Sequence, residues 1–163
     1  MGATATDLNG RTYTKTYSST AYTPEYNRCV VNYNTCIDNL NASLNEYNPL
    51  KEKVDSWDKY VPALESLKLY YESVQILTSS ALNFFSNGGY ICDGQPLRGA
   101  ELTGILNSLS SVKSAVDIYE DVKLELDSLK EKLSNKKNNV IQAQNALRTA
   151  SYALENTIKY KDM

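Results

Sequence analysis

Apolar residues recur at intervals of seven through the second half of the chain. The series is unbroken over eight positions, namely Ile105, Val112, Tyr119, Leu126, Leu133, Val140, Leu147 and Leu154. A helix that packs along another helix keeps this interval, whereas a half-buried strand alternates with a period of two. The pattern predicts one long helix from about residue 100 to residue 160, and we call these eight residues the heptad seam. The seam is also the candidate contact for oligomer formation.

A second apolar stripe, with steps of three and four residues, runs through the first half of the chain. Its start is marked by Thr23, Pro24 and Glu25, which supply a hydroxyl cap, a proline whose missing N–H costs nothing, and an acid in the first turn. A helix is therefore predicted to begin at residue 24. Pro49 and Pro62 each remove a hydrogen bond within this helical stretch, which predicts kinks or short breaks near both prolines.

The two predicted helical arms have nearly the same length, with 63 residues in 24–86 and 61 residues in 100–160. Two glycines follow residue 87, and glycine readily adopts the backbone conformation that ends a helix. We therefore predict an all-α fold, a long antiparallel helical hairpin or coiled coil with a tip loop at residues 87–99. The alternative is a four-helix bundle, because Pro49 would lie opposite Ser134–Asn139, a stretch of poor helix formers, and turns at both places would fold each arm in two.

The first 22 residues differ from the rest of the chain. Tyrosine and charged residues alternate with threonine between residues 11 and 17, a period of two that favours extended backbone. We predict that residues 1–22 form an extended N-terminal docking arm and that residues 23–163 form the helical hairpin. Tyr13, Tyr17 and Tyr22 are the candidate partner-binding residues of the arm, since tyrosine is favoured where one end of a side chain is buried against a partner. A disordered tail is the other interpretation.

Composition and charge narrow the classes of partner. The net charge is −2 and no basic block is present, which argues against nucleic acid as a partner because phosphate binding needs clustered Lys and Arg. No stretch reaches the roughly 18 apolar residues of a membrane span, so no membrane partner is predicted. The N-terminus has no apolar core of a secretory signal, which predicts synthesis in a cytoplasm without a signal peptide.

Residues suited to catalysis are sparse. The chain has no histidine, which excludes Ser-His and Cys-His nucleophiles, and its three cysteines do not form a zinc set. We predict no enzymatic activity, no cofactor and no metal site. Cys29 and Cys36 are seven residues apart on one helical face, about 10 Å along the axis, which is too far for a disulfide.

The tip loop is the best candidate for specific recognition, because loops on rigid scaffolds often carry binding residues. It presents Tyr90 and Ile91, which are the candidate partner-binding residues there. A simple connector is the other interpretation of this loop.

The leading functional interpretation is a non-enzymatic structural protein, a coiled-coil component of a larger assembly. A polar arm, a long coiled coil and a lack of catalytic residues are typical of phage and virus particles, so we expect a virion fibre, collar or tail component. Apolar residues beyond a two-helix seam, such as Leu69, Ile118 and Leu124, also predict a homo-oligomer that binds protein partners through its arm. The alternative is a helical-hairpin binding protein or exported effector that acts through its tip loop.

Overall fold

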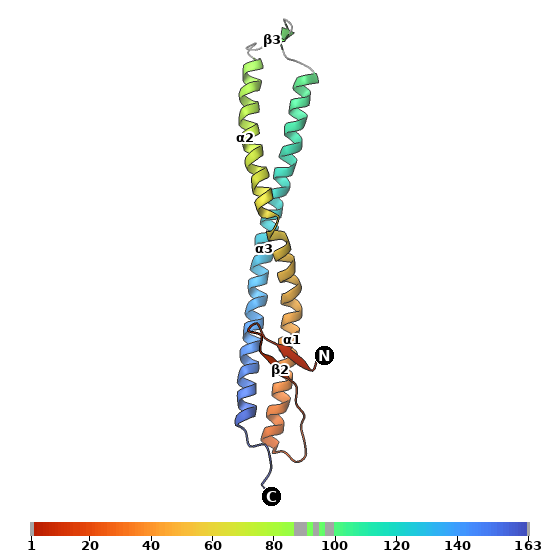
Figure 1. The fold of residues 1–163 in the computed structure, drawn as a ribbon, viewed down its shortest axis with the longest axis vertical. Coiled ribbons are helices and arrows are strands. Elements are labelled where there is room, and N and C mark those ends of the chain that lie inside the picture. Colours follow the sequence, from red (N-terminus) through yellow and green to blue (C-terminus); the bar gives the residue numbers. More distant parts are fainter. Residues whose placement is uncertain (1, 87–90, 93–94, 97–99, 163) are drawn as a thin grey trace. The chain divides into compact units, whose positions relative to one another are not determined.

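The computed structural model describes residues 2–86, 91–92, 95–96 and 100–162. Within this part of the chain, the side chains at 77–106, 109, 111–113 and 115 lie outside the description. Most of the chain is helical (Figure 1). The helices are α1 (Pro24–Asp58, 35 residues), α2 (Val61–Ser86, 26 residues) and α3 (Ala100–Asn156, 57 residues). The prediction that helix dominates the fold is therefore confirmed.

The chain divides into two compact units. Unit 1 comprises residues 1–54 and 129–163, and unit 2 comprises residues 55–128. The predicted boundary between residues 22 and 23 lies inside unit 1, so the N-terminal segment belongs to the same unit as the start of α1.

Helix α1 begins where its capping residues predict. The Thr23 hydroxyl accepts a hydrogen bond from the Tyr26 N–H at 3.1 Å, and Pro24 occupies the first helical position. Pro49 lies inside α1, which continues to Asp58. The kink expected near Pro49 therefore does not interrupt the helix.

The interruption predicted near Pro62 is present. Lys59 and Tyr60 form a turn between α1 and α2, in which the Tyr60 N–H donates to the Trp57 carbonyl at 3.0 Å. Pro62 is the second residue of α2, where a proline removes no intrahelical hydrogen bond.

The four-helix alternative required turns at Pro49 and at Ser134–Asn139. Both positions lie within continuous helices, α1 and α3, so this alternative is wrong. The poor helix formers in α3 each cost only tenths of a kcal/mol, about 0.7 at most, and packing of the neighbouring apolar residues offsets that cost.

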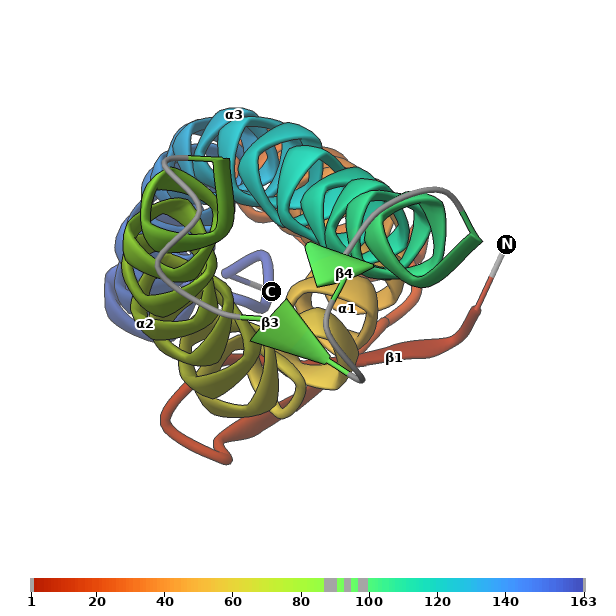
Figure 2. The same ribbon diagram turned by 90° about the horizontal axis from the view of Figure 1, so that it is seen from above.

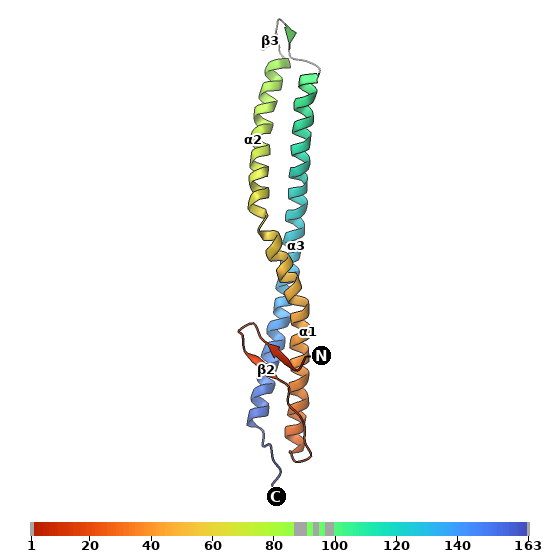
Figure 3. The same ribbon diagram turned by 45° about the vertical axis from the view of Figure 1, so that its right-hand side comes forward.

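In unit 1, α1 and the C-terminal part of α3 run in opposite directions side by side (Figures 1 and 3). Near one end the Thr23 hydroxyl donates to the Ile158 carbonyl at 2.6 Å, and farther along α1 the Lys136 ammonium pairs with Glu46 at 2.6 Å. Four aliphatic side chains between the helices are completely or almost completely buried: Ile37, Leu40, Val140 and Leu147.

Unit 2 contains α2 and the N-terminal part of α3, which also run in opposite directions. Lys68 pairs with Glu120 at 2.8 Å and Glu65 pairs with Lys123 at 3.6 Å. The higher residue number in α2 thus pairs with the lower residue number in α3, as antiparallel helices require. The buried side chains among the described residues of this pair include Tyr71, Tyr119 and Leu126. Two short strands, β3 (Ile91–Cys92) and β4 (Gln95–Pro96), also lie in unit 2 and pair antiparallel (Figure 2).

The N-terminal segment folds back on itself instead of forming one extended arm. Strands β1 (Thr4–Thr6) and β2 (Thr12–Thr14) pair antiparallel, with Ala5 opposite Tyr13. The turn between them is held by Asp7, whose Oδ1 accepts the N–H groups of Asn9 and Arg11 at 2.9 Å. Gly10 has a φ of +83°, a conformation that glycine adopts without strain. The alternating pattern predicted extended backbone correctly, but this turn converts the segment into a hairpin.

Candidate protein-binding surfaces

The described part of the heptad seam packs within the chain. Tyr119, Leu126, Val140 and Leu147 are at most 6% exposed. Leu133 and Leu154 pack against the core cluster of unit 1. The side chains of the remaining two seam residues, Ile105 and Val112, lie outside the described part. The antiparallel helix within each unit covers the four buried side chains, whereas Leu133 and Leu154 keep part of their surface exposed. The role of the seam in oligomer formation stays a prediction.

The predicted partner-binding tyrosines of the arm have different environments. Tyr13 is 3% exposed and faces the core of unit 1, whereas Tyr17 is 85% exposed and Tyr22 is half-buried. Tyr13 therefore offers no surface to a partner in this fold. Tyr90 lies outside the described residues, and of Ile91 only the backbone in β3 is described.

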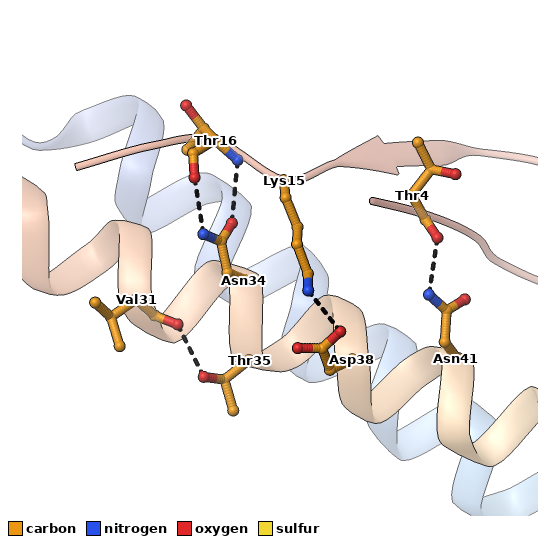
Figure 4. A network of polar contacts seen from close by, with 8 residues as sticks. All are labelled: Thr4, Lys15, Thr16, Val31, Asn34, Thr35, Asp38 and Asn41. Atoms are coloured by element: carbon orange, nitrogen blue, oxygen red, sulfur yellow. Dashed lines mark hydrogen bonds and ion pairs between the residues drawn. The ribbon is translucent and has the colours of Figure 1, made fainter. Parts of the chain in front are cut away.

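Asparagines on one face of α1 hold the N-terminal segment through its backbone. The Asn34 side chain accepts the Thr16 N–H at 3.1 Å and donates to the Thr16 carbonyl at 2.8 Å, while Asn41 donates to the Thr4 carbonyl at 2.8 Å (Figure 4). Asn27 binds the N–H and carbonyl of Ser19 in the same two-point manner, at 3.0 and 2.8 Å.

These three asparagines, Asn27, Asn34 and Asn41, are seven residues apart, so they lie in one row along the helix. We call them the asparagine row. Lys15 adds an ion pair with Asp38 at 2.7 Å beside the row (Figure 4). Apolar periodicity does not predict this row, although its spacing of seven is visible in the sequence.

Three tyrosines surround the ammonium group of Lys159. The Lys159 Nζ lies 4.8 Å from the ring centre of Tyr22, 5.4 Å from that of Tyr160 and 5.7 Å from that of Tyr26. Desolvation acts to lower the pKa of Lys159, but the nearby tyrosines outweigh it and the pKa is raised above its ordinary value. The Thr23 N–H also donates to the Lys159 carbonyl at 2.9 Å, so this cluster fastens the C-terminal segment to the start of α1.

Several large apolar side chains of unit 2 face outward. Leu69 and Ile76 in α2 are 65% and 68% exposed, and Leu124 in α3 is 70% exposed. At 100° per residue, each lies about 140° to 160° around its helix from the buried tyrosine of that helix, Tyr71 or Tyr119. The α2–α3 pair therefore cannot bury them, and we call these three residues the outer apolar positions.

A groove of about 310 Å³ lies at the turn between α1 and α2. It is lined by Ser56, Trp57, Tyr60, Leu64 and Val122, all within unit 2. Its walls are mainly apolar, and the turn that interrupts the helices exposes Tyr60 to 66%. The groove could accept an apolar side chain of a partner.

Cys29 and Cys36 are both free thiols, as their spacing predicts. Burial raises the pKa of the Cys36 thiol, so this side chain stays protonated, whereas Cys29 is only half-buried and contacts the Thr157 hydroxyl at 3.5 Å. Cys36 is therefore a packing residue, because the thiolate is the reactive form.

Alkylation of the folded protein is expected to modify Cys29 at least about tenfold faster than Cys36, since Cys36 reacts only after local opening of unit 1. Peptide mapping by mass spectrometry after timed iodoacetamide treatment measures both rates. In denaturant, which serves as the control, the two rates should converge. Equal rates in the folded state would contradict the burial of Cys36.

The structure holds no group of three or more His, Cys, Asp or Glu side chains placed to bind a metal ion among the residues it describes. Over that same part of the chain, none of the helices combines the length and the apolar character needed to cross a lipid bilayer. Comparisons of the chain with protein-family models, with curated proteins and with solved structures find no match.

Proposed function

We propose that this chain is a non-enzymatic structural protein of a larger assembly, built as a long antiparallel coiled-coil hairpin that associates with further copies of itself. Two observations support the hairpin. The described seam residues are packed within the chain, and the helical segments in each unit run in opposite directions. The proposed site of action is a virion or another extended assembly, with a fibre, collar or tail component of a phage or virus as the leading candidate.

The outer apolar positions carry this proposal. Each of Leu69, Ile76 and Leu124 is at least 65% exposed, and burial of one such side chain contributes about 1.5–3 kcal/mol. Exposed apolar side chains on the faces opposite the helix contact favour a second layer of protein over solvent. Both helices of the pair carry such residues, which suits a homo-oligomer of hairpins better than a single bound peptide.

Docking onto the assembly is proposed to use the exposed part of the N-terminal segment. Tyr17 projects from this segment at 85% exposure, beyond the last residue of β2. Deletion of residues 1–22 would not test this role cleanly, because Ala5 and Tyr13 belong to the core of unit 1.

Substitution of Leu69 and Ile76 together by glutamate is expected to shift the protein from an oligomer toward a monomer of 18.2 kDa. With two substitutions in each copy, the interface between two copies would contain four carboxylates, and burial of a charge there is unfavourable. Multi-angle light scattering over a range of protein concentrations measures the mass.

The control is the double change to methionine, which keeps both positions apolar and should keep the wild-type mass. Circular dichroism checks that the helices persist in both variants. If the wild-type chain is a monomer at every concentration, self-association is refuted, and the alternative of a helical-hairpin binding protein or exported effector gains support. In that case the groove beside Trp57 is the described surface to examine.

A further inference from the structure

The two units carry opposite net charges. Unit 1 contains 12 Lys and Arg against 8 Asp and Glu, a formal charge of +4. Unit 2 contains 5 Lys and Arg against 11 Asp and Glu, a formal charge of −6. The net charge of −2 for the whole chain conceals this division, which favours contact between unit 1 of one copy and unit 2 of another.

The charges on α3 are also matched in spacing. Four acidic residues of α3 in unit 2, with Lys123 among them, follow one another at intervals of one, four and two: Glu120, Asp121, Glu125 and Asp127. Four basic residues of α3 in unit 1, with Glu131 among them, have the same intervals in reverse order: Lys130, Lys132, Lys136 and Lys137. We call these the acidic segment and the basic segment.

An antiparallel alignment of the two segments places two kinds of opposite-charge pair on one side of the helix, because at 100° per residue Asp121, Glu125, Lys132 and Lys136 lie within about 60° of one another. Glu125 then meets Lys132 and Asp121 meets Lys136, and because each copy contributes both segments the contact holds four such pairs. The other four charges of the segments lie on the opposite side of α3 and take no part. No such pairing is available within one chain, because both segments lie in the single helix α3 and run in the same direction. The complementary segment must come from a second copy.

The charged side chains are accessible for such a contact. Seven of the eight are exposed and Lys136 is half-buried. Several of them already interact within the chain: Glu120 pairs with Lys68, Lys136 pairs with Glu46, and Lys130 also has a contact there. Both in-chain pairs are at the surface, where an ion pair contributes at most about 1 kcal/mol, so they can be shared with a partner helix.

We propose that two copies of this chain associate antiparallel through α3, with the acidic segment of each copy on the basic segment of the other. The contact is self-complementary, because every copy offers both segments. This inference rests on the proposed function and specifies how its copies recognise one another. The charges fix the register and direction of this contact.

Charge reversal tests the register. An acid-reversed variant carries Asp121→Lys and Glu125→Lys, and a base-reversed variant carries Lys132→Glu and Lys136→Glu. Each variant alone places like charges opposite one another and is expected to dimerise roughly 100-fold more weakly than the wild type. An equimolar mixture of the two variants restores opposite charges at all four positions of a mixed dimer. Its affinity should return to within about threefold of the wild type.

Sedimentation velocity at about 0.05 M and about 1 M NaCl measures the affinities, and high salt should weaken the wild-type dimer. The matched control reverses Glu72 and Asp117, two other exposed acids of unit 2, which changes the charge equally outside the segment. It should dimerise like the wild type at the higher salt concentration. A monomeric wild type, a failure of the mixture to recover, or an equal loss in the control would each overturn the inference.

The two proposals fail in different ways. If the Leu69 and Ile76 glutamate variant dissociates but charge reversal has no effect, the α3 contact is refuted and the proposed structural role stands. If charge reversal and recovery behave as expected while the glutamate variant keeps its mass, the α3 contact is supported and the outer apolar positions are not the association surface.

Discussion

Replacement of Leu147 by alanine is expected to lower the free energy of unfolding by about 2–5 kcal/mol. Leu147 is 0% exposed and belongs to the core cluster of unit 1, together with Ile37 and Leu40 of α1. The substitution removes apolar contacts and leaves a cavity that the paired helices can close only partly, because α1 and α3 are tied on both sides of it by Thr23 and Glu46. Urea denaturation followed by circular dichroism measures the change.

Leu124→Ala is the matched control, since it makes the same substitution in the same helix at a side chain that is 70% exposed. At protein concentrations low enough to keep the chain monomeric, its effect should stay within about 0.5 kcal/mol. A small loss for Leu147 and a large loss for Leu124 would mean that the heptad seam faces another molecule and that the outer apolar positions face the core.

The helices could be predicted from the sequence because their signals are local. The cap at Thr23 and Pro24 and the interruption near Pro62 are both confirmed. Pro49 gives the same local signal as Pro62, a proline within a helical pattern, but α1 continues through it. A proline inside a helix costs about 3 kcal/mol, and the buried side chains of Tyr47 and Val54 on either side of Pro49 supply the packing that keeps α1 continuous.

The N-terminal segment was harder to predict, because its fold depends on residues distant in sequence. The alternation between residues 11 and 17 indicated extended backbone but gave no partner strand. The pairing of Ala5 with Tyr13 depends on the turn at Asp7, and the position of the hairpin depends on the asparagine row of α1. The asparagine side chains of α1 bind backbone groups of the N-terminal segment. Because backbone groups do not depend on residue type, the sequence of that segment does not predict these contacts.

The exposure of the candidate partner-binding residues also depends on residues distant in sequence. Tyr13 and Tyr17 have similar sequence contexts, since each follows a threonine and their separation of four residues puts them on the same face of an extended chain. The structure separates them because β2 ends at Thr14, so that Tyr13 is fixed against the helices and Tyr17 is not. Exposure could not be inferred from residue type, because tyrosine is suited to both positions.

Tyr13 provides the second large expected effect. Tyr13→Ala should lower the free energy of unfolding by about 3 kcal/mol, because the ring is 3% exposed, packs in the core of unit 1 and lies 5.0 Å beneath the Arg11 guanidinium. Tyr13→Phe should leave stability unchanged or raise it by up to about 1 kcal/mol. The buried Tyr13 hydroxyl has no hydrogen-bond partner among the described atoms, so its removal eliminates an unfavourable desolvation.

Tyr17→Ala is the control on the same segment, and it should change stability by less than about 0.5 kcal/mol because the side chain is 85% exposed. The three variants together separate a folded hairpin from a free docking arm. In a free arm all three substitutions would leave the unfolding of the helices unchanged, and only incorporation into an assembly would respond. In the fold described, the alanine change at Tyr13 weakens unit 1 itself, whereas Tyr17 remains available for a partner that docks on the outside of the segment.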